Sequence, residues 1–293
     1  MEENKQLLSP KLDIVFHALF REENKDLLGE LITDVLKERV KVITTDKNRQ
    51  VNIKTAEEKY GIMDLRAELA GGIKCNIEIQ LEQETYEKER ILYYWADAYS
   101  RQMNKSDEYV ELKKTISIVI LGHEIKEMRG IEKLGAKWQI RDEESGKRVL
   151  TDRLEIVIIE LPKAKRIYEK NKKDRIGQWM MFLDNPNNKE VSKIMSSNKE
   201  IEKAFEELEQ VSGNEELRRL AELRIKGIRD KKAQIDYAKQ EGIKEGIEKG
   251  MKQEREKRDT EIVKKMLKKK ISMEDIIEIT VLSKEEIEKI SKI

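Results

Sequence analysis

The sequence predicts an α/β protein in which a mixed central sheet is flanked by helices and followed by an α-helical C-terminal extension. Alternating apolar residues on both sides of a glycine pair predict a β-hairpin over residues 62–81. Runs rich in isoleucine and valine at residues 116–121 and 154–161 predict strands buried on both faces. Helical spacings of apolar residues precede and follow these strands. At 293 residues, the chain has room for one substantial domain and appendages.

The first predicted element is a helix that begins near residue 9. Ser9 is the expected cap and Pro10 stands in the first turn, a position that tolerates proline. Apolar residues follow at helical spacings as far as Leu36, and Glu23-Asn24 indicates a break between two helices. Residues 40–43 and 51–53 then indicate two short β segments.

The hairpin brings polar side chains together on one face. Ala70-Gly71-Gly72 supplies the positive φ angles that a tight loop needs. Counting pairs outward from Gly71 places Asp64 opposite Glu78, with Cβ atoms roughly 4.5–5.5 Å apart. The same register pairs Glu68 with Lys74, and these opposite charges favour it. Gln80 follows one step along the same face.

Two carboxylates and an amide on rigid strands predict a metal site. Together with the backbone carbonyl of Ile79, they offer the hard oxygen ligands that Mg²⁺ prefers. A metal held there would activate water and neutralise the charge of a phosphodiester. Residue types alone also allow a simpler interpretation, in which the acidic residues belong to the solvated face of an amphipathic hairpin.

A helix is expected over residues 84–104. Its two sides differ, because Leu92, Trp95, Tyr99 and Met103 lie along the predicted buried side, whereas Tyr86, Arg90, Tyr94, Asp97 and Arg101 lie along the other. Arg90 can project back toward the carboxylates, where it would contact phosphate. An internal salt bridge from Arg90 to Asp97 or Glu87 is the alternative.

The connection over residues 124–152 is charged and contains a turn at residues 143–147. We expect this insertion to cover one edge of the sheet or to form another hairpin. His123 follows Gly122 at the end of a predicted strand and is a candidate base, but no partner is visible and no role is assigned to it.

Composition shifts divide the chain into three predicted parts. Residues 1–190 form the compact domain, because 184–188 (Asp-Asn-Pro-Asn-Asn) interrupt the helical pattern. Residues 191–258 form a charged helical arm in which Gly242, Gly246 and Gly250 recur every four residues, which suits a homo-oligomer or an exposed, marginal helix. Residues 259–293 form a small helical tail, either a helix-turn-helix or a cap.

Charge and cysteine content limit the partners and the compartment. The chain has 60 Lys and Arg residues and 59 Asp and Glu residues, so its net charge does not indicate a nucleic-acid partner. Residues 163–175 and 264–270 are nevertheless locally basic. Cys75 is the single cysteine, which excludes an internal disulfide and favours a reducing compartment. Without a signal-peptide pattern or an apolar run of about 18 residues, we expect a soluble cytoplasmic protein with no membrane partner.

The order of Asp64, the glycine turn and Ile-Glu-Ile-Gln at residues 77–80 resembles the PD-(D/E)XK nuclease signature, in the variant where glutamine replaces lysine. That variant is typical of the Rpn family of recombination-promoting nucleases, also called PD-(D/E)XK nuclease family transposases. Further segments resemble the family in the same order: residues 9–16, residues 89–95 with Tyr99, residues 179–183 and the glycine repeat. The chain departs from the pattern at His17, where a lysine is expected.

This resemblance implies a restriction-endonuclease-like α-β-β-β-α-β core and a metal-dependent DNA endonuclease linked to recombination or mobile elements. Asp64, Glu78 and the Ile79 carbonyl would hold Mg²⁺ or another divalent cation such as Mn²⁺ or Ca²⁺, and Gln80 would orient the attacking water. No organic cofactor is implied. Additional candidates are Arg90, Tyr94 and Asp13, although Asp13 also suits an ordinary helix-start position.

Glutamine at position 80 leaves a second interpretation open. Gln80 carries no charge and cannot accept a proton as a lysine amine can, so a bound metal would have to do more of the activation. The alternative is a non-catalytic DNA-binding or self-associating protein that retains the nuclease fold. A purely structural role for the hairpin face is a third possibility.

Overall fold

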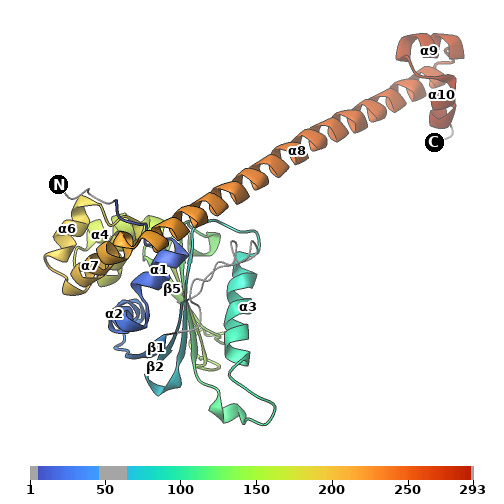
Figure 1. The fold of residues 1–293 in the computed structure, drawn as a ribbon. Helices are drawn as coiled ribbons and strands as arrows, with labels where there is room; N and C mark the ends of the chain where they lie inside the picture. The colour runs from blue at the N-terminus through green and yellow to red at the C-terminus, as the bar shows by residue number, and fades with distance from the viewer. Residues whose placement is uncertain (1–5, 46–64, 292–293) are drawn as a thin grey trace. The chain divides into compact units, whose positions relative to one another are not determined.

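The computed structural model describes residues 6–45 and 65–291 of the chain (Figure 1). The chain divides into two compact units, Met1–Gly227 and Ile228–Ile293, each of which is described by itself. Among the helices of the described residues, none is both long enough and apolar enough to cross a membrane.

In the first unit, the described residues form a six-stranded mixed sheet with the order β1-β2-β3-β4-β6-β5. The strands are β1 (Val42–Thr45), β2 (Leu65–Leu69), β3 (Lys74–Gln80), β4 (Thr115–Leu121), β5 (Gly135–Trp138) and β6 (Leu154–Glu160). The pairs β3–β4 and β4–β6 are parallel, and the others are antiparallel. This sheet confirms the predicted α/β class.

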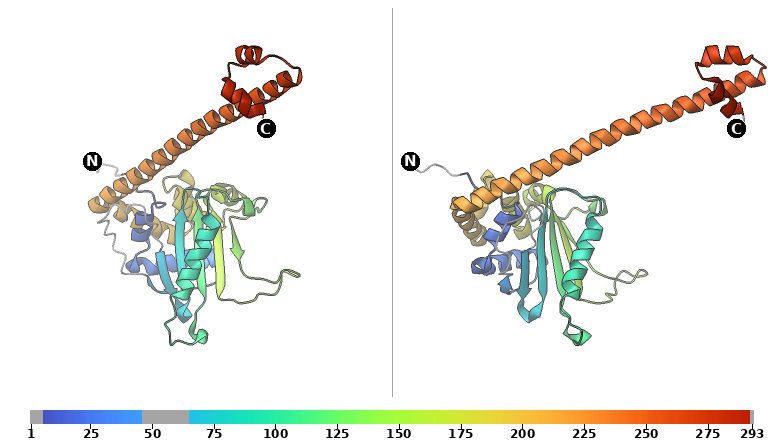
Figure 2. Two further views of the ribbon diagram at one scale, coloured as in Figure 1. Left: turned by 90° about the vertical axis from the view of Figure 1, so that its right-hand side faces the viewer. Right: turned by 45° about the vertical axis from the view of Figure 1, so that its right-hand side comes forward.

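Helices cover both faces of the sheet. The helices of the first unit are α1 (Asp13–Leu19), α2 (Lys25–Leu36), α3 (Glu87–Ser100), α4 (Ala164–Lys170), α5 (Arg175–Asp184), α6 (Lys189–Met195), α7 (Lys199–Gly213) and the beginning of α8 (Glu215–Lys268). Figures 1 and 2 show α3 along one face of the sheet, with α1 and α2 on the opposite side. Among the described residues, the order from α1 to β4 agrees with the predicted α-β-β-β-α-β arrangement.

The N-terminal helices differ from the prediction at their start. Helix α1 begins at Asp13 rather than at residue 9, because the N–H of Leu12 donates to the carbonyl of Ser9 (3.1 Å) in a preceding turn. A break near residues 23–24 is confirmed, since a short 3-10 helix at Glu22–Asn24 separates α1 from α2.

The hairpin register is confirmed over every described pair of β2 and β3, from Leu65 opposite Ile77 to Glu68 opposite Lys74. Lys74 Nζ lies 2.5 Å from Glu68 Oε2. Gly71 and Gly72 have φ angles of 81° and 78°, which explains the glycines in this loop. The predicted segment at residues 51–53 and the predicted site residue Asp64 lie outside the described residues.

The polar face of the hairpin is buried on β3, so its interpretation as a solvated surface is wrong. Asn76, Glu78 and Gln80 are only 7%, 2% and 6% exposed. Strand β3 lies between β2 and β4, and α3 crosses the sheet on the side where these residues lie (Figure 1). A single strand pattern cannot show that a helix will cover its polar side.

Helix α3 is rotated relative to the prediction. Ile91 is buried and Leu92 is 52% exposed, whereas Leu92 was expected on the buried side. Trp95 does pack against the core, and its Nε1 donates to the Thr115 carbonyl (2.9 Å). This rotation directs Glu87 and Arg90 toward β3, where they contact the buried side chains of Gln80 and Glu78.

The remaining strands and the insertion agree with expectation. Strands β4 and β6 are buried throughout. Within residues 124–152, β5 pairs antiparallel with β6 at the edge of the sheet, and a bridge between Arg141 and Val149 closes a further turn. The insertion therefore both covers an edge and forms a hairpin-like turn.

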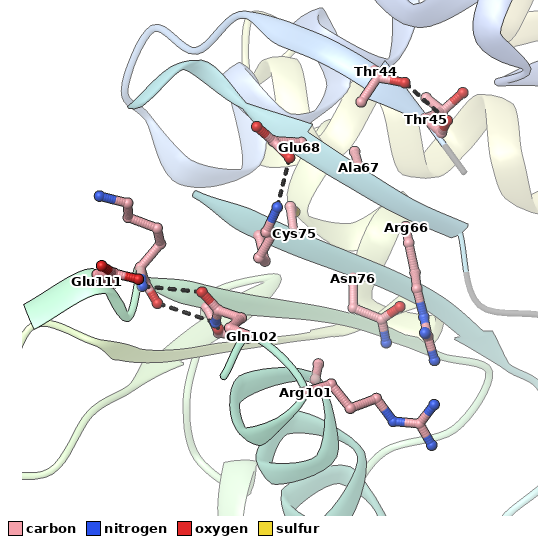
Figure 3. Close-up of a pocket in the computed structure, with 14 residues that line it drawn as sticks. Thr44, Thr45, Arg66, Ala67, Glu68, Cys75, Asn76, Arg101, Gln102 and Glu111 are labelled. Atoms are coloured by element: carbon pink, nitrogen blue, oxygen red, sulfur yellow. Dashed lines mark hydrogen bonds and ion pairs between the residues drawn. The ribbon is translucent and has the colours of Figure 1, made fainter. Parts of the chain in front are cut away.

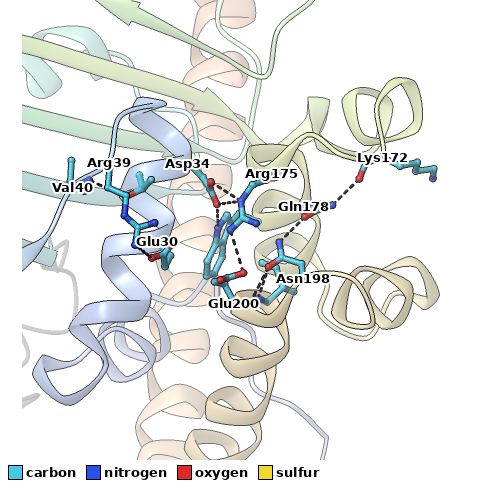
Figure 4. A network of polar contacts seen from close by, with 12 residues as sticks. Glu30, Asp34, Arg39, Val40, Lys172, Arg175, Gln178, Asn198 and Glu200 are labelled. Carbon is cyan, nitrogen blue, oxygen red and sulfur yellow. Dashed lines mark hydrogen bonds and ion pairs between the residues drawn. The ribbon is translucent and has the colours of Figure 1, made fainter.

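The first unit extends beyond the boundary predicted at residue 190, because polar contacts join α7 to α5 and α2 (Figure 4). Arg175 Nε donates to Asp34 (2.8 Å) and its Nη2 donates to Glu200 (3.3 Å). Asn198 Nδ2 donates to Gln178 Oε1 (2.7 Å). These pairs are far apart in the sequence, so the pattern of residues 191–213 alone does not reveal them.

The second unit contains the rest of α8, together with α9 (Met273–Thr280) and α10 (Lys284–Ser291). Its apolar cluster contains the buried residues Val263, Met266, Ile276 and Ile287. The Ser283 hydroxyl accepts from the Glu286 N–H (3.3 Å) and Glu286 Oε2 accepts from the Ser283 N–H (2.8 Å), which is a capping box. Homo-oligomerisation through the glycine repeat of α8 stays a prediction.

Glu22 links β1 to the helical layer through hydrogen bonds to Thr45. We therefore predict that Glu22 makes a pH-dependent contribution to stability. The N–H of Thr45 donates to Glu22 Oε2 (2.6 Å), and this bond, with those from Lys25 and the Thr45 hydroxyl, lowers the pKa of Glu22 to about 2. We expect Glu22→Gln to lower the free energy of unfolding at pH 7 by about 1–2 kcal/mol, because charge-assisted hydrogen bonds are lost. Urea denaturation measures this difference.

The pH dependence has a definite sign. Because the pKa of Glu22 is lower in the folded chain than its ordinary value of 4.5, its contribution is complete above that value and is lost as the pH falls toward about 2. The difference between wild type and Glu22→Gln should shrink over that range. Glu23→Gln, which changes an exposed neighbour, is the matched control. A constant difference across the range would contradict this role.

Candidate active site

Glu78 and Arg90 form an ion pair between β3 and α3. Arg90 Nη2 lies 2.9 Å from Glu78 Oε1, and Arg90 Nη1 lies 2.9 Å from Glu84 Oε2. Arg90 therefore projects back toward the sheet, as the sequence predicts. The partners differ from those considered for a salt bridge, because Asp97 instead pairs with Arg101 (2.8 Å). A buried carboxylate needs such a partner, since desolvation of an isolated charge is costly.

Gln80 is held in one orientation by groups of opposite hydrogen-bonding character. Arg90 Nη2 donates to Gln80 Oε1, while Gln80 Nε2 donates to Glu87 Oε1 (2.9 Å) and to the Glu82 carbonyl (3.3 Å). Arginine only donates and an ionised carboxylate only accepts, so this network fixes which amide atom faces which neighbour. The accepting oxygen of Gln80 is directed to the same guanidinium as Glu78.

His123 joins this network at the end of β4. Its Nε2 lies 2.9 Å from Glu87 Oε1, and its buried Nδ1 has no hydrogen-bond partner in the described part of the chain. The backbone of Gly122 lies close to that of Leu81, directly after β3. Only glycine fits there, because an added Cβ would lie 2.7 Å from the Leu81 carbonyl oxygen. The β3–β4 register also brings the end of β4 beside Gln80, whose carbonyl accepts from the Gly122 N–H (2.8 Å).

Sequence reasoning missed Glu84 as part of this site and considered Glu87 only as an alternative partner of Arg90. A signal for Glu87 was available, since residues three apart on a helix share one face and Glu87 precedes Arg90 by three. No comparable signal joined His123 to Glu87, which lies 36 residues earlier in the chain. Their contact depends on the parallel pairing of β3 and β4.

Two further candidates, Asp13 and Tyr94, have partners of their own. Asp13 accepts from the Ile14 N–H (2.9 Å) and from Arg224 Nε (3.1 Å), so it ties α1 to the first part of α8. Tyr94 is half-buried on α3, one turn after Arg90, and packs edge-to-face with Tyr93 at 5.7 Å between ring centroids. The structure thus gives Asp13 a structural partner and keeps Tyr94 on the helix that carries Arg90.

The oxygen atoms at this site suit a hard cation. Because the Gln80 carbonyl is directed at β4, strand alternation directs the Ile79 carbonyl to the opposite side, toward β2. Glu78, Glu84 and Glu87 bring three carboxylates to this site, and carboxylates favour a nearby positive charge. The residues that the structure describes contain no cluster of three acidic, histidine or cysteine side chains that could hold a metal ion.

A helix, three strands, a helix and a further strand, with buried Glu78 and Gln80 on the third strand, define a nuclease-like fold of the PD-(D/E)XK type. The family model described as PD-(D/E)XK nuclease family transposase matches residues 10–238, and the chain belongs to this family. No curated protein and no solved structure matches the chain. Family membership supports a nuclease-type function, and PD-(D/E)XK nucleases generally use divalent metal ions.

The ion pair predicts a strong effect of Arg90 on stability. We expect Arg90→Ala to lower the free energy of unfolding by about 2–4 kcal/mol, because it removes the guanidinium that is ion-paired with the buried Glu78. Glu78→Gln should cost less, since a neutral amide can still accept from Arg90. Urea denaturation of both single variants and of the double variant gives the coupling energy.

The double variant should lose less stability than the two single variants together. Arg101→Ala is the matched control, because Arg101 directly follows α3 and its side chain, paired with Asp97, is exposed. Strictly additive losses would show that the two side chains do not depend on each other.

Proposed function

We propose that the protein is a metal-dependent DNA endonuclease that hydrolyses phosphodiester bonds. The observation that carries this proposal is the pairing of buried Glu78 and Gln80 on β3 beneath α3, in a chain of this nuclease family. Asp64, which lies outside the described residues, is assigned through the register: the pair after Leu65 and Ile77 would be residues 64 and 78. The position of Asp64 opposite Glu78 is therefore itself proposed.

In this proposal, Asp64, Glu78 and the Ile79 carbonyl hold Mg²⁺, with Mn²⁺ or Ca²⁺ as other candidate ions. A bound divalent cation supplies water activation and neutralises charge on the phosphodiester. Gln80 Oε1 accepts a hydrogen bond from the attacking water and so orients it, but its amide cannot take the proton. Arg90 contributes donors for phosphate oxygens beside Glu78, and Glu87 keeps the Gln80 amide in its orientation.

The proposal has consequences for partners and setting. DNA is the substrate, the compartment is the cytoplasm, and a link to recombination or mobile elements follows the Rpn resemblance. The glycine repeat of α8 is the proposed contact for a homo-oligomer. In the residues described, an added Cβ at Gly242, Gly246 or Gly250 meets no atom within 4 Å, so this side of the helix has space for a partner.

One contact favours the alternative, a non-catalytic DNA-binding or self-associating protein. Arg90 already binds Glu78 Oε1 and Gln80 Oε1, so a metal would have to compete with a guanidinium for the same oxygens. Measurement of cleavage and binding on one preparation separates the two functions. DNA binding without cleavage in Mg²⁺ or Mn²⁺ would favour the alternative.

The nuclease proposal predicts which carboxylates are needed for cleavage. We expect Glu78→Gln and Asp64→Asn to reduce the nicking of supercoiled plasmid by at least about 100-fold, because each removes a charged metal ligand. EDTA should abolish the wild-type activity and excess Mg²⁺ should restore it.

The control for this experiment is Glu127→Gln, an equal change of charge on an exposed residue paired with Lys88. Thermal unfolding of each variant checks that the fold is retained. If the Glu78 and Asp64 variants nick plasmid as fast as the Glu127 control, the assignment of the active site is wrong.

A further inference from the structure

A row of buried polar atoms crosses three strands beside Glu78. Arg66 on β2, Asn76 on β3 and Ser117 on β4 are register partners. Arg66 Nε, Asn76 Oδ1 and Ser117 Oγ are all buried, and none has a hydrogen-bond partner among the described residues. Folded proteins leave few buried polar groups unsatisfied, so three in one row need an explanation.

These unsatisfied atoms are concentrated on one side of the sheet. Among the described residues, six buried side-chain nitrogen or oxygen atoms lack a hydrogen-bond partner. Three form the row, and Arg90 Nε and His123 Nδ1 belong to the candidate active site. The sixth, Glu160 Oε2, is ion-paired with Lys163. Five of the six therefore lie at or next to the proposed site of cleavage.

Two members of the row, Arg66 and Asn76, line a pocket of about 940 Å³ between the β2–β3 hairpin and the C-terminal end of α3. Figure 3 shows Arg66 and Asn76 extending from the strands and Arg101 from the helix. Four cationic side chains line the pocket, Arg66, Lys74, Arg101 and Lys113, against two acidic ones, Glu68 and Glu111. The volume falls within the usual range of small-molecule sites.

The lining selects a ligand with two kinds of group. The guanidinium groups of Arg66 and of Arg101, which also pairs with Asp97 through its Nε, suit an anion such as a phosphate. Asn76 Oδ1 accepts hydrogen bonds and, at 7% exposure of its residue, requires a donor. A fully ionised phosphate has no proton to give to Asn76, whereas a nucleotide offers phosphate oxygens together with base N–H donors.

The distance between Asn76 and Glu78 indicates which nucleotide of a DNA strand the pocket would bind. Asn76 and Glu78 are two residues apart on one face of β3, which corresponds to about 7 Å. This is comparable to the separation of neighbouring phosphates along a DNA strand. We infer that the pocket binds the nucleotide adjacent to the scissile phosphate, with Arg66 and Arg101 on its phosphate and Asn76 on its base. The inference rests on the proposed nuclease function.

In this arrangement Arg66 and Asn76 are binding residues that hold the strand in register with Glu78. Their loss should weaken DNA binding and raise KM while leaving kcat nearly unchanged. The two residues should differ in salt dependence, because only a cation on a phosphate contributes to counterion release. That difference distinguishes a nucleotide contact from a general loss of stability.

The test measures binding of a fluorescent duplex oligonucleotide to the full chain by anisotropy, in Ca²⁺ and over a range of salt concentrations. We expect Arg66→Gln to raise Kd about tenfold and to reduce the slope of log K against log salt by about 0.9. Asn76→Ala should raise Kd by a similar factor and leave the slope unchanged. Arg66→Lys should keep the slope, because the charge remains.

Arg39→Gln is the matched control, since it removes the same charge from a side chain that is 83% exposed and does not line this pocket. If Arg66→Gln and Asn76→Ala both bind as the control does, the row is satisfied by water and the inference is overturned. If wild type does not cleave DNA but Arg66-dependent binding persists, the nuclease proposal fails while the nucleotide site is supported.

Discussion

The buried carboxylate of Glu78 determines how the α3 face of the sheet is arranged. Removing a carboxylate from water is costly unless a cation and hydrogen bonds replace the solvent. Arg90 is that cation, so α3 must lie with position 90 over β3. This requirement turns Ile91 into the core and Leu92 out to solvent, opposite to what apolar patterning alone would favour. An electrostatic demand from one strand thus determines the orientation of the helix above it.

The sheet beneath α3 has an apolar part, which packs against the helix, and a polar part, which carries the candidate site. Val119 and Leu121 of β4 and three residues of β6 form a core cluster with Ile91, and this cluster holds the helix in place. Burial of each such side chain contributes on the order of 1.5–3 kcal/mol. Strands β2 and β3 supply the polar part, where Arg66, Asn76 and Glu78 lie. The apolar part offsets the cost of keeping unsatisfied polar atoms in the other.

Local features and the projection of Arg90 toward the sheet were predictable from the sequence, whereas other contacts across the fold were not. The register of β2 and β3 follows from alternation and from one glycine loop, so Glu68 meets Lys74 as expected. Burial of Glu78 could not be inferred, because a strand pattern does not show whether a helix covers it. The contact of His123 with Glu87 depends on strand pairing. The true extent of the first unit likewise depends on distant pairs such as Asp34 with Arg175.

The choice of glutamine at position 80 is coupled to Arg90. A lysine amine there would have donors and no acceptor when charged, so it could not accept the hydrogen bond that Arg90 gives to Gln80 Oε1. It would also place a second cation next to the guanidinium, where like charges repel. Glutamine accepts from Arg90 with one amide atom and donates to Glu87 with the other, and so satisfies both neighbours at once. Gln80 and Arg90 are therefore best understood as one unit, in which the amide compensates for the arginine that the buried Glu78 requires.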